Sequence, residues 1–427
     1  MRRWAIWGMA AFAFLLVTFH RFALGAIADE LMRAWGIGAY GLGGLSSLYF
    51  YLYALLQLPS GVLADTLGPR RTLFVSALLL AFGSSLFGLA SNLSLAYIGR
   101  FLIGLGSAAV FVNILKLQAV WFPPKSFATM TGLTATVGNL GAIFAGAPFA
   151  LLAKAIGWRV SFELFGLLAL ILASLLIAIV RDGPEASDLG TGDWGLETRD
   201  WLSLRVSGLQ SLVSRRKESV KALWAVISNP RIWPPFFTRV GFDGTFFAFF
   251  ALWGVPYLMQ VHDLPREEAA GAVSLGILGF LLLAPIGGII SDRILARRKL
   301  PIVSSAIVYT ALWGVLAFSR GRLPLLLLYL TLFLMGIFAT STLLCLASAK
   351  ELYHPRAVGS AVAFVNMGGF VGGALMQLLL GYILDLGWRG EMLSGVRVYP
   401  VEAFQQAFFF CLLLMLLATL TSLLIRD

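Results

Sequence analysis

The chain contains 427 residues, of which 59% are hydrophobic and 12% are charged. Because about a quarter of the residues in soluble domains are charged, this composition excludes a soluble globular protein and indicates an integral membrane protein. The net charge of +11 would favour nucleic acid as the partner of a soluble protein. In a membrane protein the informative quantity is how that charge is distributed along the loops, so we expect no nucleic-acid partner.

Twelve apolar runs are long enough to cross a bilayer, which takes about 20 residues each. They begin near Ile6, Leu42, Thr72, Leu95, Phe127, Phe162, Ile232, Ala269, Pro301, Leu325, Val358 and Phe404. With Met1 placed inside the cell, most Lys and Arg residues fall in cytoplasmic segments, in agreement with the positive-inside rule. We therefore predict an all-α, multi-pass protein of twelve transmembrane helices in the cytoplasmic (inner) membrane, with both termini in the cytoplasm.

The first and second runs carry polar groups that stand out from their surroundings. His20 and Arg21 lie in the first run, and Tyr49 and Tyr53 in the second. The two tyrosines are four residues apart, so a helix places them on one face.

A short charged loop follows the second run and recurs about half a chain later. The first copy reads Gly61-Val62-Leu63-Ala64-Asp65-Thr66-Leu67-Gly68-Pro69-Arg70-Arg71, and the second extends from Gly287 to Arg298 with Asp292, Arg293 and Arg297. A basic cytoplasmic loop of the ordinary kind would explain one copy. Two copies at this spacing indicate that the chain is built from two related halves.

This loop resembles the signature of the major facilitator superfamily, G-x-x-x-D-x-x-G-x-R-[RK], closely in the first copy and loosely in the second. Arg100, with Gly104 and Gly106, resembles the superfamily's R-x-x-x-G-x-G element. The resemblance implies two pseudo-symmetric six-helix halves with a substrate site between them near the membrane midplane. It also implies that one set of charged residues controls opening of the cytoplasmic side: Asp65, Arg70, Arg71, Arg100, Asp292, Arg293 and Arg297.

A second internal repeat supports the two halves. Val137–Gly141 precedes Gly157-Trp158-Arg159, and Val365–Gly369 precedes Gly387-Trp388-Arg389. We divide the chain into an N-terminal half (1–180), a cytoplasmic linker (181–230) and a C-terminal half (231–427).

The linker contains apolar residues at helical spacing between Trp201 and Ile227. This spacing predicts an amphipathic helix on the inner membrane face, with Arg215, Arg216 and Lys217 toward lipid headgroups. A binding site for a regulatory partner is the alternative interpretation.

Charged side chains deep inside membrane spans are costly, so they are the first functional candidates. The cations are Arg21, Arg100, Lys116 and Arg239, whereas Asp243 is the one clearly deep acid. This excess of positive charge favours an anionic or carboxylate-bearing substrate. The setting of Arg21 is similar to that of the first-helix arginine in organophosphate and organic-anion members of the superfamily. The alternative is a structural arginine that bonds helix carbonyls.

Arg239 and Asp243 are four residues apart and share one helical face. They could simply neutralise each other. Alternatively, the substrate binds Arg239 while Asp243 accepts a proton, which would couple transport to the proton gradient. His20 could also relay protons, or it could serve as an interface group between helices.

Further polar side chains in the spans could bind substrate or hold helices together, and the sequence does not separate these roles. The candidate substrate-binding residues are Arg21, Arg239, Tyr49, Tyr53, Asn113, Lys116, Asn139 and Asn366.

Taken with the resemblance, these features predict a secondary active transporter that moves a small anionic solute, with proton coupling, as a functional monomer in the lipid bilayer. The sequence contains no nucleotide-binding loop, catalytic triad or metal-ligand cluster, so we expect no enzyme activity, metal or cofactor. Export of a siderophore or metabolite on the same fold is the alternative. A non-transporting receptor or an intramembrane enzyme is a more distant one.

Overall fold

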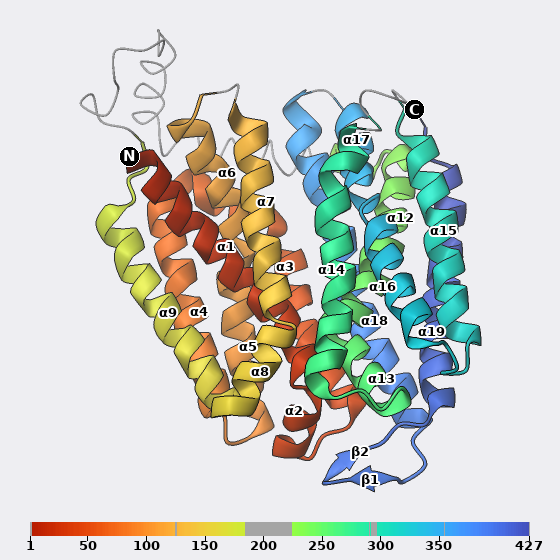
Figure 1. Cartoon of the computed structure of the whole chain (residues 1–427). Helices are drawn as coiled ribbons and strands as arrows, with labels where there is room; N and C mark the ends of the chain where they lie inside the picture. Colours follow the sequence, from red (N-terminus) through yellow and green to blue (C-terminus); the bar gives the residue numbers. More distant parts are fainter. Residues whose placement is uncertain are drawn as a thin grey trace.

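The computed structural model describes residues 2–123, 126–183, 224–289, 291, 297–353 and 355–426. The helices form two bundles that lie side by side, and the two chain ends lie at the same end of the molecule (Figure 1). A two-stranded hairpin lies at the opposite end. We call these two ends the terminal end and the hairpin end.

The first bundle is built by the elements up to residue 183. These are α1 (Arg2–Ala26), α2 (Ala28–Trp35), α3 (Ala39–Leu67), α4 (Pro69–Leu89), α5 (Leu93–Ala108), α6 (Val110–Trp121), α7 (Phe127–Phe144), α8 (Ala147–Ile156) and α9 (Trp158–Ile179). The predicted amphipathic helix, with Arg215, Arg216 and Lys217, lies outside the described residues except for its last few positions.

The second bundle is built by the elements from residue 230 onward. These are η2 (Pro230–Ile232), α12 (Trp233–Ala248), η3 (Phe249–Trp253), α13 (Gly254–Val261), α14 (Arg266–Ile289), α15 (Lys299–Phe318), α16 (Leu325–Ala339), α17 (Thr342–Glu351), α18 (Pro355–Leu386), β1 (Met392–Leu393), β2 (Val396–Arg397) and α19 (Val401–Leu423). The strands β1 and β2 pair antiparallel.

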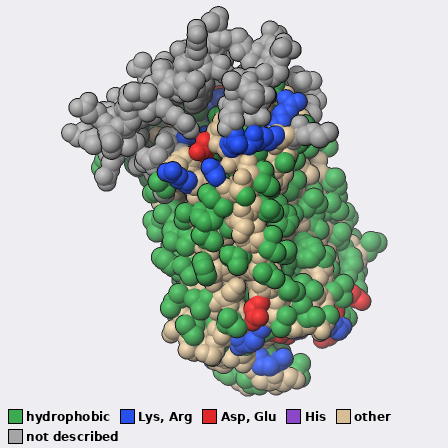
Figure 2. Space-filling view, turned by 90° about the vertical axis from the view of Figure 1, so that its left-hand side faces the viewer, with side chains coloured by type: hydrophobic (Ala, Val, Ile, Leu, Met, Phe, Trp, Pro, Cys, Tyr) green, Lys and Arg blue, Asp and Glu red, His purple; other side chains and the backbone are tan. Residues whose placement is uncertain are grey.

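Ten helical segments are long and apolar enough to cross a membrane, and the bent α7–α8 pair makes eleven if it counts as one span. α3 is a further helix of 29 residues, although some of its side chains lie outside the description. Each of the twelve predicted runs begins within one of these helices. Hydrophobic side chains cover the middle of the face in Figure 2, and charged side chains gather near its ends. The prediction of an all-α membrane protein is therefore confirmed, while the exact count of twelve stays a prediction.

Several spans are interrupted near their middle. α7 and α8 meet at a bend of 46°, where Gly146 leaves the helical conformation and Pro148 occupies the first turn of α8. Proline is tolerated there because the first turn has no intrahelical partner for its N–H. In the second bundle, η3 is a π-helical turn between α12 and α13. Such turns often occur at functional sites.

Glycines allow the two bundles to approach closely. A Cβ added at Gly25 of α1 would lie 3.0 Å from the carbonyl oxygen of Ala251 in η3. One added at Gly43 of α3 would lie 2.6 Å from the carbonyl oxygen of Gln377 in α18. Small residues that let backbones meet are the usual means of packing helices in membranes. The interface between the bundles is therefore tight on the hairpin side of the molecule.

Candidate functional site

Arg21 lies on α1 at the interface between the bundles, with 8% of its surface exposed. Its guanidinium carbon is 4.9 Å from the ring centroid of Tyr53 and 5.1 Å from that of Phe370. The rings of Tyr49 and Phe247 are at 5.7 and 5.8 Å. A cation near the face of an aromatic ring is attracted by the ring's quadrupole. Two rings from each bundle therefore hold the charge of Arg21, and we call these four rings the aromatic cage.

The hydrogen-bonding capacity of Arg21 is only partly used. The rings of both cage tyrosines lie beside its guanidinium, but its Nε and Nη2 atoms are buried without a hydrogen-bond partner. Buried donors are nearly always paired in proteins, so an unpaired donor needs an explanation. Because two neighbouring N–H groups of a guanidinium match the two oxygens of a carboxylate, Arg21 has the free donors that an anion requires.

The cage also joins the two bundles. The rings of Tyr53 and Phe370 stack with their centroids 4.1 Å apart, and Phe50 lies 5.1 Å from Phe247. Tyr53 and Phe50 come from α3, whereas Phe247 and Phe370 come from α12 and α18. Arg21 is thus enclosed where the two halves meet, and relative movement of the halves would open or close its surroundings.

Arg239 and Asp243 form an ion pair within α12. An Nη2 atom of Arg239 is 3.1 Å from a carboxylate oxygen of Asp243, and both side chains are almost fully buried. Arg239 also donates to the Thr342 carbonyl oxygen at 2.8 Å and to Asn366 Oδ1 at 3.0 Å. The pairing that the sequence left open is therefore present, and both Nη atoms of Arg239 have partners, whereas its Nε is buried without one.

The packing around Asp243 explains part of the sequence pattern on α18. A Cβ added at Gly369 would overlap the Asp243 carboxylate, so glycine makes room for the acid there. Gly369, which contacts Asp243, is followed directly by Phe370 of the aromatic cage around Arg21. The two charged groups thus belong to one region between the halves.

His20 and Arg100 contact other helices of the first bundle. The His20 ring bonds the Leu16 carbonyl oxygen at 2.8 Å and Ser84 Oγ at 3.0 Å. Arg100 donates to the carbonyl oxygens of His20 at 2.9 Å and Leu45 at 3.4 Å. None of these hydrogen bonds involves a residue of the aromatic cage. The guanidinium carbon of Arg100 nevertheless lies 5.3 Å from the ring centroid of Tyr49.

The remaining substrate-binding candidates differ in their contacts. Asn113 is buried and donates to the Ala109 carbonyl oxygen of its own helix at 2.8 Å, and its Oδ1 has no partner. Lys116 on α6 and Asn139 on α7 are half-buried. Tyr49 and Tyr53 are therefore the predicted residues that the structure brings directly to Arg21, and Asn366 reaches Arg239.

The predicted gating residues are only partly described. Asp65 lies in α3, but its side chain is outside the description, and Asp292 and Arg293 are outside the described residues. The backbone N–H of Arg70 donates to Asp182 at 2.7 Å, and its side chain donates to the Ile177 carbonyl oxygen. Arg71 and Arg297 are exposed. The loop after α3 thus contacts the end of α9.

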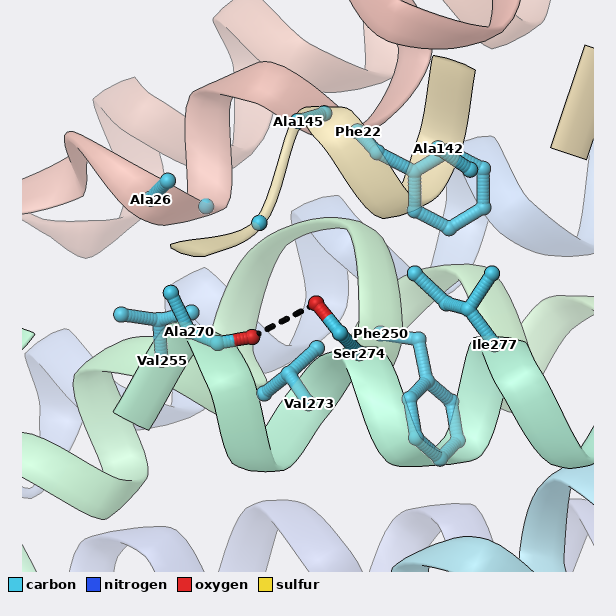
Figure 3. Close-up of a pocket in the computed structure, with 12 residues that line it drawn as sticks. Phe22, Ala26, Ala142, Ala145, Phe250, Val255, Ala270, Val273, Ser274 and Ile277 are labelled. Atoms are coloured by element: carbon cyan, nitrogen blue, oxygen red, sulfur yellow. Dashed lines mark hydrogen bonds between the residues drawn. The ribbon is translucent and has the colours of Figure 1, made fainter. Parts of the chain in front are cut away.

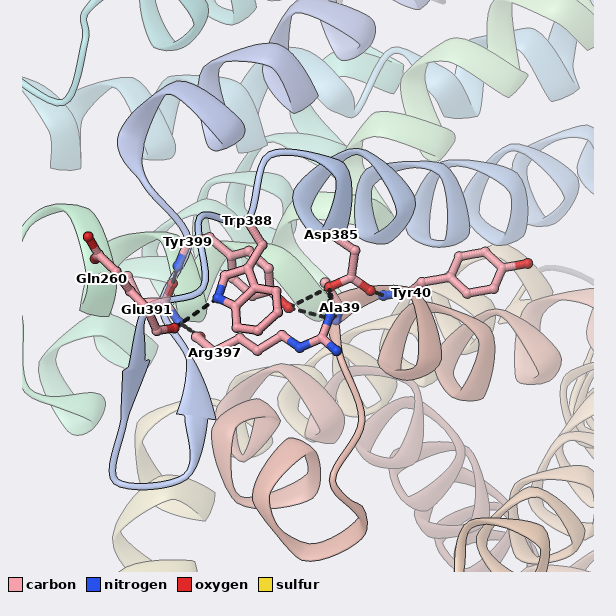
Figure 4. Close-up of polar contacts among 8 residues, drawn as sticks. All are labelled: Ala39, Tyr40, Gln260, Asp385, Trp388, Glu391, Arg397 and Tyr399. Carbon is pink, nitrogen blue, oxygen red and sulfur yellow. Dashed lines mark hydrogen bonds and ion pairs between the residues drawn. The ribbon is translucent and has the colours of Figure 1, made fainter.

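A polar network closes the hairpin end (Figure 4). Asp385 of α18 accepts the N–H groups of Ala39 at 3.0 Å and Tyr40 at 2.9 Å, which begin α3 in the other bundle. The N-cap of α3 is Gly38, which has no side chain to satisfy these donors. Asp385 therefore caps a helix of the opposite half, where a carboxylate is favoured by the free N–H groups and the helix dipole.

Two neighbours hold Asp385 in place. Tyr399 donates its hydroxyl to Asp385 at 2.8 Å, and an Nη atom of Arg397 lies 3.0 Å from the carboxylate. Burial, together with the hydrogen bond to Asp385, raises the pKa of the Tyr399 hydroxyl above its ordinary value. Tyr399 consequently remains a donor to the carboxylate at every physiological pH.

Ion pairs add to this closure. Arg266 of α14 pairs with Asp29 at 2.7 Å and with Glu30, both on α2. Lys154 of α8 pairs with Glu267 of α14. These contacts join opposite bundles at the hairpin end. The molecule is thus held closed at that end.

A small pocket lies between the bundles beside α14 (Figure 3). Phe22 and Ala26 of α1 line one side, and Val273 and Ile277 of α14 line the other. Its volume of about 10 Å³ admits one water molecule at most. The Ser274 hydroxyl beside it donates to the Ala270 carbonyl oxygen at 2.9 Å. The pocket is too small and too apolar to hold an organic anion.

Among the described residues, no group of three or more His, Cys, Asp or Glu side chains could hold a metal ion.

Known proteins resemble the chain over most of its length. It is 22% identical to the probable sulfoacetate transporter of Cupriavidus necator, with 90% of this chain and 87% of that protein covered. It is 25% identical to the hexuronate transporter of Bacillus subtilis, with 86% and 84% covered. The inward-facing, unoccupied crystal structure of a bacterial homologue of the human lysosomal transporter Spinster has the same fold, with a TM-score of 0.75, 16% identity and 99% and 98% coverage.

The family model of the Major Facilitator Superfamily matches residues 10–319 and 244–427. These two matches together span almost the whole chain and agree with the loop motifs and the two-bundle fold. The protein therefore belongs to the Major Facilitator Superfamily.

Proposed function

We propose that the protein is a secondary active transporter that carries a small organic anion across the cytoplasmic membrane by alternating access. The observation that carries this proposal is the buried guanidinium of Arg21, which has unpartnered N–H groups and lies where the two halves meet. A charge at this depth needs a counter-charge or hydration, and a bound anion supplies the first. The names of the relatives, which refer to sulfoacetate and hexuronate, support an anionic substrate.

The positive-inside rule assigns the terminal end to the cytoplasm. Because the contacts of Asp385 and Arg266 join the bundles at the hairpin end, we take the structure to be a state that is closed to the outside. Transport requires these contacts to break and the halves to close at the terminal end. The predicted gating residues act in that second state, and their role remains a prediction. They are Asp65, Arg70, Arg71, Arg100, Asp292, Arg293 and Arg297.

We assign the proposed proton coupling to the pair of Arg239 and Asp243. While Asp243 is ionised, it occupies Arg239 at 3.1 Å. Protonation of Asp243 removes the counter-charge of Arg239, which keeps its bonds to Thr342 and Asn366, so that the positive charges of Arg21 and Arg239 clamp the anion from opposite halves. His20 stays second to Asp243 as a proton-coupling group, because both of its ring nitrogens are already bonded within the first bundle.

A screen of thermal stability in detergent tests the anion assignment. Each carboxylic acid is compared with its neutral carboxamide, which has nearly the same shape. A ligand that binds only the folded protein raises its stability, so at saturating concentration we expect acids to raise the melting temperature by a few degrees and amides to leave it unchanged. Equal stabilisation by an acid and its amide would contradict the role of Arg21 as an anion site.

The closed hairpin end gives a separate prediction. Replacing Asp385 with Asn removes the carboxylate that caps α3 and accepts hydrogen bonds from Tyr399 and Arg397. The outside-closed state is therefore destabilised. A cysteine introduced at Ala26, which is buried between the two bundles, reports this change. We expect it to react several-fold faster in Asp385→Asn than in the parent protein with a membrane-impermeant thiol reagent applied from outside. The background lacks Cys345 and Cys411, and Asp263→Asn, an exposed acid at the same end, is the matched control. An unchanged reaction rate in Asp385→Asn would exclude the gating role of this cap.

A further inference from the structure

We infer that the transported anion is a carboxylate with a planar, largely apolar body, such as an aromatic acid, rather than a polyhydroxylated sugar acid. This inference rests on the proposed function and specifies the chemical class of the substrate. Three features of the region around Arg21 support this inference: the shape of the aromatic cage, the position of the unpaired N–H groups of Arg21, and the hydrogen bonds that already occupy the polar side chains of neighbouring spans.

The cage offers flat apolar faces. The rings of Phe247 and Phe370 are nearly parallel, with an angle of 21° between their planes, and those of Tyr53 and Phe370 are at 25°. Aromatic rings prefer offset-stacked or edge-to-face contacts with other rings. A planar ligand that enters between the halves can therefore replace the contact between Tyr53 and Phe370 with contacts of the same kind.

The unpaired hydrogen-bond donors of Arg21 lie beside the aromatic cage. Arg21 Nε and Nη2 form one edge of the guanidinium plane, and both lack partners. A carboxylate that binds this edge is held beside the cage, because the four ring centroids lie 4.9 to 5.8 Å from the guanidinium carbon. A planar acid can thus bring its carboxylate to Arg21 and its ring to the cage together.

The polar side chains of the neighbouring spans are largely committed to the protein. Gln377 donates to the Phe247 carbonyl oxygen at 3.1 Å, and Thr245 donates to the Gly241 carbonyl oxygen at 2.8 Å. Asn366 accepts from Arg239 at 3.0 Å. A sugar acid carries hydroxyl groups along its whole length, and each one that is buried without a partner weakens binding.

Two buried amide oxygens, Asn113 Oδ1 and Gln377 Oε1, have no partner in the described structure. They can accept from one or two donor groups, such as a ring hydroxyl or amine. The hydroxyl oxygens of Ser46 and Thr342 are also buried without a partner among the described residues, but these four oxygens lie on four different helices and do not form one row along the length of a sugar acid. The described site therefore matches a carboxylate with few polar substituents.

Calorimetric titration of the purified protein with three monocarboxylates tests this inference. Benzoate is planar, cyclohexanecarboxylate has a ring of similar size that is not flat, and galacturonate is polyhydroxylated. We expect benzoate to bind at least about 10-fold more tightly than galacturonate and several-fold more tightly than cyclohexanecarboxylate.

Variants of Phe370 locate the effect. Phe370→Leu should remove most of the preference for benzoate over cyclohexanecarboxylate, whereas Phe370→Tyr, which keeps the ring, should preserve it. Phe409→Leu, at an exposed position of α19, is the matched control. A fully retained preference in a folded Phe370→Leu protein would overturn the inference.

The two levels of the proposal fail differently. Tighter binding of galacturonate than of benzoate would overturn the planar, apolar class while leaving an anion transporter intact. Equal affinity of the protein for each acid and its amide would instead remove the proposed function itself.

Discussion

Replacement of Arg21 with lysine is expected to weaken the binding of a small organic anion by about 10-fold to 100-fold. Lysine keeps the positive charge but has no planar fork of donors, and it cannot present two N–H groups to one carboxylate. It also loses the contact of the guanidinium with the rings of Tyr53 and Phe370, whose centroids lie 4.9 and 5.1 Å from the guanidinium carbon. Calorimetry with the best ligand from the stability screen measures this change.

Two companion variants make the result specific. Arg239→Lys should also weaken binding if both arginines clamp the anion, and it perturbs the ion pair with Asp243 in addition. Arg322→Lys, at an exposed position between α15 and α16, should bind with wild-type affinity. Wild-type affinity in both Arg21→Lys and Arg239→Lys would exclude the clamp and leave only a general electrostatic role.

Replacement of Asp243 with asparagine is expected to abolish accumulation driven by a proton gradient, while exchange of labelled for unlabelled substrate continues. Asparagine resembles the protonated acid in shape and cannot release or take up a proton. In the variant, Arg239 keeps its bonds to Thr342 and Asn366 but loses its carboxylate partner. Binding therefore remains possible, but its link to the proton gradient is lost.

Exchange in proteoliposomes serves as the internal control of this experiment, because a misfolded protein would lose exchange as well. The loss of a buried counter-charge can cost about 3 to 5 kcal/mol of stability, so the thermal stability of Asp243→Asn is measured alongside. Asp263→Asn, an exposed acid at the end of α13, should accumulate substrate as the wild type does. Undiminished accumulation in Asp243→Asn would place the coupling group elsewhere, with His20 or the substrate itself next in order.

Periodicity and residue type were sufficient for the helices and for half of the cage. The runs beginning near Ile6 and Leu42 are helices because they are long, apolar and without internal charge clusters. Tyr49 and Tyr53 share a face because they are four residues apart, and that face meets Arg21. The pair of Arg239 and Asp243 follows from the same spacing.

The other half of the cage could not be predicted from the sequence. Phe247 and Phe370 are apolar residues in apolar spans, so nothing distinguishes them from lipid-facing or core phenylalanines. Their role arises only when the second bundle docks against Arg21. A weak signal is available for Phe370, because it follows Gly368 and Gly369, where the backbone of α18 packs closely against α12.

The role of Asp385 could not be predicted from the sequence either. In the sequence it is an acid near the end of a span, and its neighbours in the chain give no hint of a partner in α3. The missing N-cap side chain at Gly38 is visible in the sequence, but the residue that replaces it comes from about 350 positions away. Contacts between halves depend on how two bundles dock, and local patterning does not encode that docking.

Uptake into proteoliposomes tests the central claim most directly. The probe is a labelled carboxylate that crosses protein-free liposomes slowly, and a proton gradient is imposed across the membrane. We predict accumulation that is saturable, competed by other carboxylates but not by the matching carboxamide, and lost in Arg21→Gln. Accumulation that persists in Arg21→Gln, or that the carboxamide inhibits as strongly as the acid, would contradict an anion transporter built around Arg21.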